Sequence, residues 1–153
     1  MVPLRRVWRT AQVVPRTPVG AVRRAATGTG HAGPMVTVDE VRAFAAGLDR
    51  SYEAVVHGRL KLRVGQIVYA AFSKDGEWMG FGFPKEERDA LVAGDPERFA
   101  LPRTSDLRFN WVQVRLATVD HDEMTELILD AWRMVVPKKV WRHHAITHDL
   151  PPD

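Results

Sequence analysis

The stretch that decides the fold is residues 59–99, which read RLKLRVGQIVYAAFSKDGEWMGFGFPKEERDALVAGDPERF. Cations at positions 59, 61 and 63 alternate with apolar residues at 60, 62 and 64, which is the period of a strand with one buried face. A turn at Gly65 leads to the apolar run 67–72, which predicts a strand buried on both faces. Asp75-Gly76 then turns the chain into a third strand, 78–83.

Further elements flank this stretch on both sides. Thr37 with Glu40, and Asp120 with Glu123, are capping boxes, so a helix should start at each. Apolar periodicity then predicts a helix over 38–47 and a long helix that stops before Pro137. The remaining predictions are strands over 53–57 and 109–116, a short helix over 84–94, and an irregular segment over 95–106.

This order of elements predicts an α+β fold. We expect an antiparallel sheet of four to five strands, with two main helices packed on one face and the other face exposed. A length of 153 residues with 45% hydrophobic residues suits one domain with its own core. Gly80 and Gly82 fall on one face of their strand, which predicts that backbone or a helix approaches closely there.

The net charge of +3 is distributed unevenly along the chain. Residues 1–34 contain six arginines and no acidic residue, whereas residues 35–153 carry 16 basic and 19 acidic side chains. We therefore expect a disordered basic leader over 1–34, either a nucleic-acid arm or a segment preceding a true start at Met35. The folded domain should cover 35–142, followed by a frayed tail over 143–153.

Several classes of function lack a sequence signal. The chain has no cysteine, which excludes disulfides, thiolate nucleophiles and cysteine zinc sites. We find no phosphate loop, dinucleotide fingerprint or nucleophile elbow, so we expect no enzyme and no cofactor. No apolar run reaches the roughly 20 residues that span a bilayer, so we expect no membrane contact. The absence of cysteine fits a cytoplasmic protein, and we expect a monomer.

Short motifs spread over about 38–142 carry a family resemblance. They are Leu62-Arg63-Val64-Gly65, Val68-Tyr69-Ala70, Phe83-Pro84-Lys85-Glu86-Glu87-Arg88, Asp95-Pro96 before Phe99, Trp111-Val112, and Ala131-Trp132-Arg133-Met134-Val135 before Pro137-Lys138-Lys139. In this order they resemble the MmcQ/YjbR family of small bacterial proteins. The resemblance implies a CyaY/frataxin-like α+β fold and DNA binding, a label that rests on a "double wing" structural analogy. Many members carry Ser-Tyr where this chain has Ala131-Trp132, so a role for those hydroxyls does not transfer.

The outward side chains of two predicted strands form the best candidate binding surface. Arg59, Lys61 and Arg63 should stand roughly 6.7 Å apart along one strand. If the last strand shares that sheet face, Trp111, Gln113 and Arg115 join them, and Tyr69 is a further candidate. Cations track phosphates and an aromatic ring can stack on a base. The alternative is an ordinary solvated sheet face.

A second basic cluster follows the long helix. It begins with Lys138 and Lys139 and continues with Arg142, His143 and His144. The two lysines could contact phosphate, or could simply complement the dipole at the carboxyl end of the long helix.

Two patterns could suggest a metal. Asp122, Glu126 and Asp130 repeat every four residues, an echo of the acidic ridge with which frataxin-like proteins bind iron, but like charges at this spacing usually mark a solvated helix face. His144 and His148 have helical ligand spacing but no adjacent carboxylate before Asp149. We therefore expect no metal site.

The sequence as a whole favours a non-enzymatic binding module with DNA as the first candidate partner. The alternative is a small-ligand or protein-interaction domain that uses the same sheet face without nucleic acid. Frataxin-like iron binding is the third hypothesis.

Deleting residues 1–34 should leave thermal stability almost unchanged, because the leader has no hydrophobic periodicity with which to pack. Thermal and urea unfolding of the full and the shortened chain would measure this. A loss above roughly 1 kcal/mol would mean that the leader packs on the domain.

Overall fold

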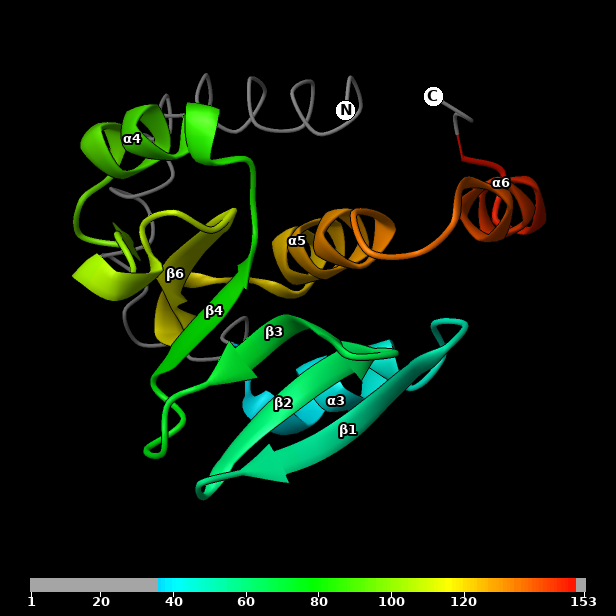
Figure 1. Ribbon diagram of the computed structural model, residues 1–153, viewed down its shortest axis with the longest axis horizontal. Coiled ribbons are helices and arrows are strands. Elements are labelled where there is room, and N and C mark those ends of the chain that lie inside the picture. The colour runs from blue at the N-terminus through cyan, green and yellow to red at the C-terminus, as the bar shows by residue number, and fades with distance from the viewer. Residues whose placement is uncertain (1–35, 151–153) are drawn as a thin grey trace, which may run out of the picture.

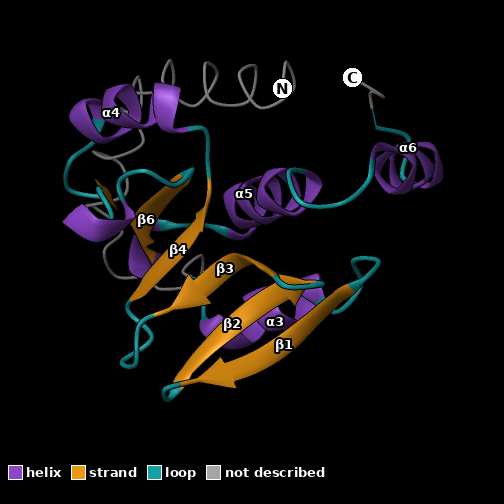
Figure 2. Cartoon of the chain, in the orientation of Figure 1, coloured by secondary structure: helices purple, strands orange, loops and turns teal. Residues whose placement is uncertain are grey.

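The computed structural model describes residues 36–150, and six strands within that range form one sheet (Figure 2). Their order across the sheet is β1-β2-β3-β4-β6-β5, and every neighbouring pair is antiparallel. The strands are β1 Ser51–Val56, β2 Arg59–Val64, β3 Ile67–Phe72, β4 Trp78–Gly82, β5 Phe99–Ala100 and β6 Trp111–Arg115. The α+β class is confirmed, with one more strand than the upper estimate. The additional strand, β5, has only two residues, too few to show a period.

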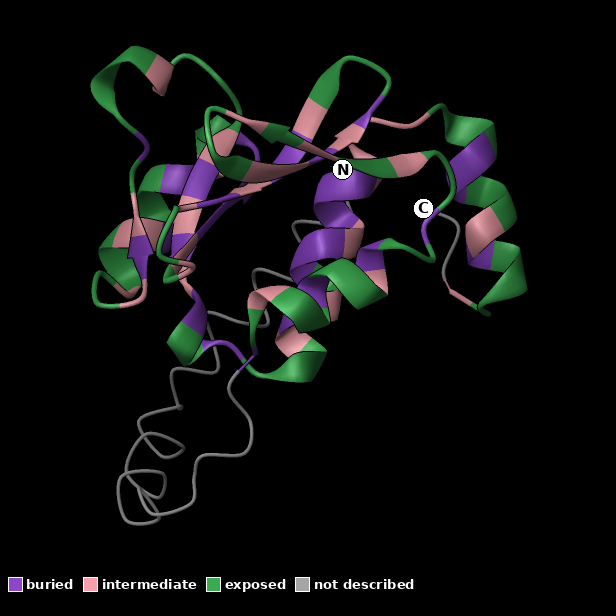
Figure 3. Ribbon diagram, turned by 90° about the horizontal axis from the view of Figure 1, so that it is seen from below, coloured by how far each residue is buried: buried purple, intermediate pink, exposed green. Residues whose placement is uncertain are grey.

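Four α-helices complete the described fold (Figure 1). They are α3 Val38–Ala45, α4 Lys85–Gly94, α5 His121–Arg133 and α6 Lys138–Thr147. The Thr37 capping box forms as predicted, and the Asp120 side chain accepts a hydrogen bond from the Glu123 backbone. Helix α5 packs against β3 and β4, and α3 packs against α5, so both lie on one side of the sheet, whereas α6 stands at one end of the domain (Figure 3). Within residues 36–150, no helix is both long enough and apolar enough to cross a bilayer.

The register of the strands separates two faces. Leu62 pairs with Ala70, Ala70 with Phe81, and Phe81 with Val112. Each of these four residues is at most 1% exposed, so this row lines the core. The neighbouring row runs through Lys61, Ala71, Gly80 and Gln113 on the opposite face. The alternation in residues 59–64 is therefore confirmed: Leu62 faces the core and Lys61 faces away from it.

Tyr69, a candidate for the exposed sheet face, lies instead on the buried face. The β2–β3 register shifts between Leu62 and Arg63, where the partners jump from Ala70 to Val68 and leave Tyr69 unpaired. This bulge turns the Tyr69 ring into the core, where it is fully buried. Its hydroxyl lies 2.6 Å from the Ser51 hydroxyl, and burial raises the pKa of Tyr69. Tyr69 therefore does not join the exposed face.

The chain after Pro137 also differs from the expectation. A frayed tail was expected over 143–153, but α6 continues through Thr147. Its residues Trp141 and Ala145 are buried, and the Trp141 ring packs edge-on against Trp132 at 6.4 Å. Pro137 stands at the N-cap position of this new helix without a side-chain capping bond, and the apolar residues of α6 are interleaved with charges that mask their periodicity.

Replacing a core residue and its outward neighbour tests the strand phase. Leu62→Ala should cost roughly 2–5 kcal/mol, because it removes buried methyl groups and leaves a cavity. Lys61→Ala, one position away on the other face, should stay within roughly 0.5 kcal/mol. Urea denaturation measures both, and equal costs would show that the phase is wrong.

Candidate nucleic-acid interface

The sheet face opposite α3 and α5 carries the candidate site, which we call the sheet platform. It consists of cations and rings on β1, β2, β4 and β6, together with one amide, and every member is partly or fully exposed: Tyr52, Arg59, Lys61, Arg63, Trp78, Trp111, Gln113 and Arg115. The register places Tyr52 opposite Arg63 and Trp78 opposite Arg115. The five strand residues predicted for the site, Arg59, Lys61, Arg63, Trp111 and Arg115, thus share one face.

Two cations of the sheet platform lie over aromatic rings. The Arg115 guanidinium carbon is 4.5 Å from the centre of the Trp78 ring, and that of Arg63 is 5.9 Å from the Tyr52 ring. Such contacts hold a long side chain in place without neutralising its charge. Sequence reasoning left Trp78 and Tyr52 out of the site. For Trp78 a signal was available, because it alternates in phase with Gly80 and so faces outward.

Trp111 lies across the sheet on top of Gly80. A Cβ built on Gly80 would stand 2.5 Å from Trp111 Nε1 and 2.9 Å from two carbons of the same indole. Only a glycine leaves room for the ring to lie this close to the strand. The expected close approach at Gly80 is therefore made by a tryptophan side chain. At Gly82, the last residue of β4, an added Cβ would instead meet Ala131 of α5 at 3.7 Å, so the end of the strand turns toward the helix and the two glycines do not share one face as predicted.

The segment at residues 84–88, which begins α4, holds the stretch of chain that leads to Trp111. Arg88 is buried, and its guanidinium donates to the backbone carbonyls of Leu107, Phe109 and Trp111 at 3.0–3.2 Å. Lys85 adds a bond from its ammonium to the Arg108 carbonyl at 3.1 Å. The planar guanidinium carries several N–H donors in fixed directions, so one arginine can bond to three carbonyls at once. Arg88 thus positions Trp111 without belonging to the exposed face.

The cations of the sheet platform have no ion-pair partner among the described residues. Within residues 36–150, no carboxylate lies within 4.0 Å of Arg59, Lys61, Arg63 or Arg115. Three arginines elsewhere in the domain are paired with carboxylates: Arg42 with Glu53, Arg98 with Glu123, and Arg103 with Asp106.

Glu53 is the acidic residue in β1, and it does not reduce the positive charge of the sheet platform. It pairs with Leu62 in the register and therefore belongs to the other face. There a hydrogen bond from Arg42 holds the pKa of Glu53 below its usual value. The sheet platform thus combines unneutralised cations with rings.

Lys138 and Lys139 are not brought to the sheet platform. Both are exposed in the first turn of α6, which lies well apart from β6 in Figures 1 and 3. They follow α5, as expected, but they also occupy the amino-terminal end of a second helix, where the dipole does not favour cations. Dipole complementarity therefore does not account for them.

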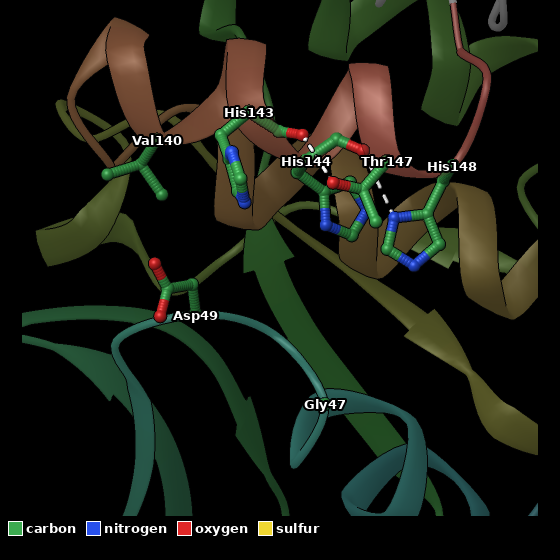
Figure 4. Close-up of a pocket in the computed structure, with 7 residues that line it drawn as sticks. All are labelled: Gly47, Asp49, Val140, His143, His144, Thr147 and His148. Atoms are coloured by element: carbon green, nitrogen blue, oxygen red, sulfur yellow. Dashed lines mark hydrogen bonds between the residues drawn. The ribbon is translucent and has the colours of Figure 1, made fainter.

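A hollow of about 250 Å³ lies between α6 and the loop that follows α3 (Figure 4). Its lining residues are Gly47, Asp49, Val140, His143, His144, Thr147 and His148. The His144 ring stacks on His148, with centroids 4.1 Å apart, and burial lowers the pKa of His144, with His148 and His143 acting in the same direction.

Within the described part of the chain, no three His, Asp or Glu side chains are grouped so that they could hold a metal ion. In the acidic repeat of α5, Asp130 is buried rather than part of a solvated ridge.

A methyl group placed under the indole tests the Trp111 geometry. Gly80→Ala should push the ring off the strand, shift the tryptophan fluorescence to the red and cost about 1–3 kcal/mol through overpacking. Gly94→Ala is the matched control, because its added Cβ meets no atom within 4 Å. Indistinguishable spectra for the two variants would show that the ring does not lie on Gly80.

Comparison with known proteins agrees with the fold just described. A crystal structure of Deinococcus radiodurans protein DR2400, which carries the DUF419 domain, is similar with a TM-score of 0.60 and 24% sequence identity. The match covers 78% of this chain and 93% of that one, and at this identity it shows the fold alone. Among curated proteins no relative matches. The YjbR family model matches residues 46–134, which include every described strand and the whole of α5, and the chain therefore belongs to the YjbR family.

Proposed function

We propose that this chain is a non-enzymatic, cytoplasmic nucleic-acid-binding module that uses the sheet platform. The observation that carries the proposal is the set of four cations, Arg59, Lys61, Arg63 and Arg115, which share an open face with two tryptophans and have no carboxylate partner within residues 36–150. Phosphates are the natural counter-charge for such a row.

The spacing of the cations supports the same ligand. Residues two apart on a strand stand roughly 6.7 Å apart, so the three cations of β2 form a line of charge rather than a point. A line of charge matches a polymer with a repeating phosphate better than it matches a compact anion. Arg115 lies across the sheet, opposite Trp78, and widens the charged area.

The net charge of −3 over residues 35–153 does not oppose this proposal. Nine of the 19 acidic residues lie on described α-helices, among them Asp122 and Glu126 on α5, which covers the other face of the sheet. Association with a polyanion depends on the local field at the contact surface more than on the total charge. The alternative partners, a protein or a small ligand on the same face, would not reproduce the salt dependence described next.

A salt titration of the full chain on short DNA tests the proposal. Replacing Arg59, Lys61 and Arg63 with Ala should weaken binding and flatten its salt dependence, because each lost phosphate contact lowers the slope by about 0.7–0.9. The matched control replaces Lys138, Lys139 and Arg142, which removes the same charge from α6.

The control should keep most of the wild-type slope. Equal losses in the two triple variants would mean that total charge, not the sheet platform, governs binding. No binding by wild type at low salt would reject the nucleic-acid proposal and favour a protein or small ligand.

A further inference from the structure

We infer that the sheet platform takes an unpaired nucleic-acid strand, with neighbouring bases stacked on Trp111 and on the Trp78–Arg115 pair. This inference rests on the proposed function and specifies its ligand. It is based on the positions of the Trp78 and Trp111 indoles, because binding of phosphates alone would need only the cations.

The strand positions of Trp78 and of Gly80, which lies beneath the Trp111 indole, favour bases that are not stacked on each other. Trp78 and Gly80 are two residues apart on β4, roughly 6.7 Å, and the Trp111 indole covers Gly80. That step is about twice the 3.4 Å rise between bases within a duplex strand. A strand whose bases are spread apart can place one base on each ring, and a stacked duplex cannot.

Both rings are held in place before any ligand arrives. Trp111 rests on Gly80 and follows the segment clamped by Arg88, while Trp78 stacks with Arg115 at 4.5 Å. A guanidinium plane is itself a surface on which unpaired bases stack, so Arg115 extends the Trp78 site rather than blocking it. Fixed rings lose little conformational freedom when a base binds.

The charges lie where the backbone of such a strand would run. Lys61 belongs to the same row as Gly80, two strands away, which is roughly 10 Å. Ala71, a small residue, lies between them. The line of cations on β2 therefore runs beside the rings, so that bases can reach the indoles while phosphates follow Arg59, Lys61 and Arg63.

Three probes of equal length separate the sources of affinity for the full chain. They are a labelled 12-nucleotide oligothymidine, a strand of the same length in which every nucleotide is abasic, and a 12-base-pair duplex. The abasic strand keeps the phosphates and lacks the bases. If bases stack, wild type should bind oligothymidine about tenfold or more tightly than the abasic strand. This ranking needs no variant, so it does not depend on how well a mutant folds.

Trp78→Ala and Trp111→Ala should each weaken oligothymidine binding about fivefold to 150-fold, and leave binding of the abasic strand within about twofold. Trp78→Phe should recover part of the loss, because it restores a ring. Ile146→Ala removes a large exposed apolar side chain from α6, outside the sheet platform, and should change nothing.

Equal affinity of wild type for oligothymidine and the abasic strand, or unchanged binding by both tryptophan variants, would overturn the inference while leaving phosphate binding intact. Preference for the duplex would overturn it as well. Failure to bind all three probes at low salt would instead reject the proposed function itself.

Discussion

The cross-strand register of β2, β3, β4 and β6 is the constraint on which the rest of the structure depends. One row, Leu62–Ala70–Phe81–Val112, is buried against the helices, and the adjacent row, Lys61–Ala71–Gly80–Gln113, faces away from them. A slip of one residue would exchange the two faces, burying cations and exposing the core. The same register that stabilises the fold therefore also assembles the sheet platform.

Arg88 acts through this register. Arg88 bonds to carbonyls at and just before the start of β6, which fixes where that strand begins and so which way Trp111 points. Gly80 contributes by having no side chain, since any Cβ would occupy the space of the indole. Arg88 and Gly80, both buried, thus fix the position of the partly exposed Trp111 ring. Their roles depend on contacts between segments that are distant in the sequence.

Much of the fold and part of the site could be predicted from the sequence. Alternation over 59–64 gave the faces of Leu62 and Lys61, because the period of a strand is local. Tyr69 could not be placed, since the bulge at Arg63 depends on pairing between two strands. The helix after Pro137 was missed because apolar residues such as Trp141 lie among charges. Expectations for residues 1–34 fall outside the described residues.

Binding of nucleic acid on the open sheet face can be measured directly by nuclear magnetic resonance, from the indole N–H signals of the full chain. Trp78 and Trp111 lie on that face, whereas Trp132 is buried beneath it with Nε1 donating to the Asp49 carbonyl at 2.9 Å. On addition of oligothymidine, we expect the signals of Trp78 and Trp111 to shift while those of Trp132 and Trp141 stay in place. Shifts confined to Trp8 of the leader, or to Trp141 of α6, would contradict it.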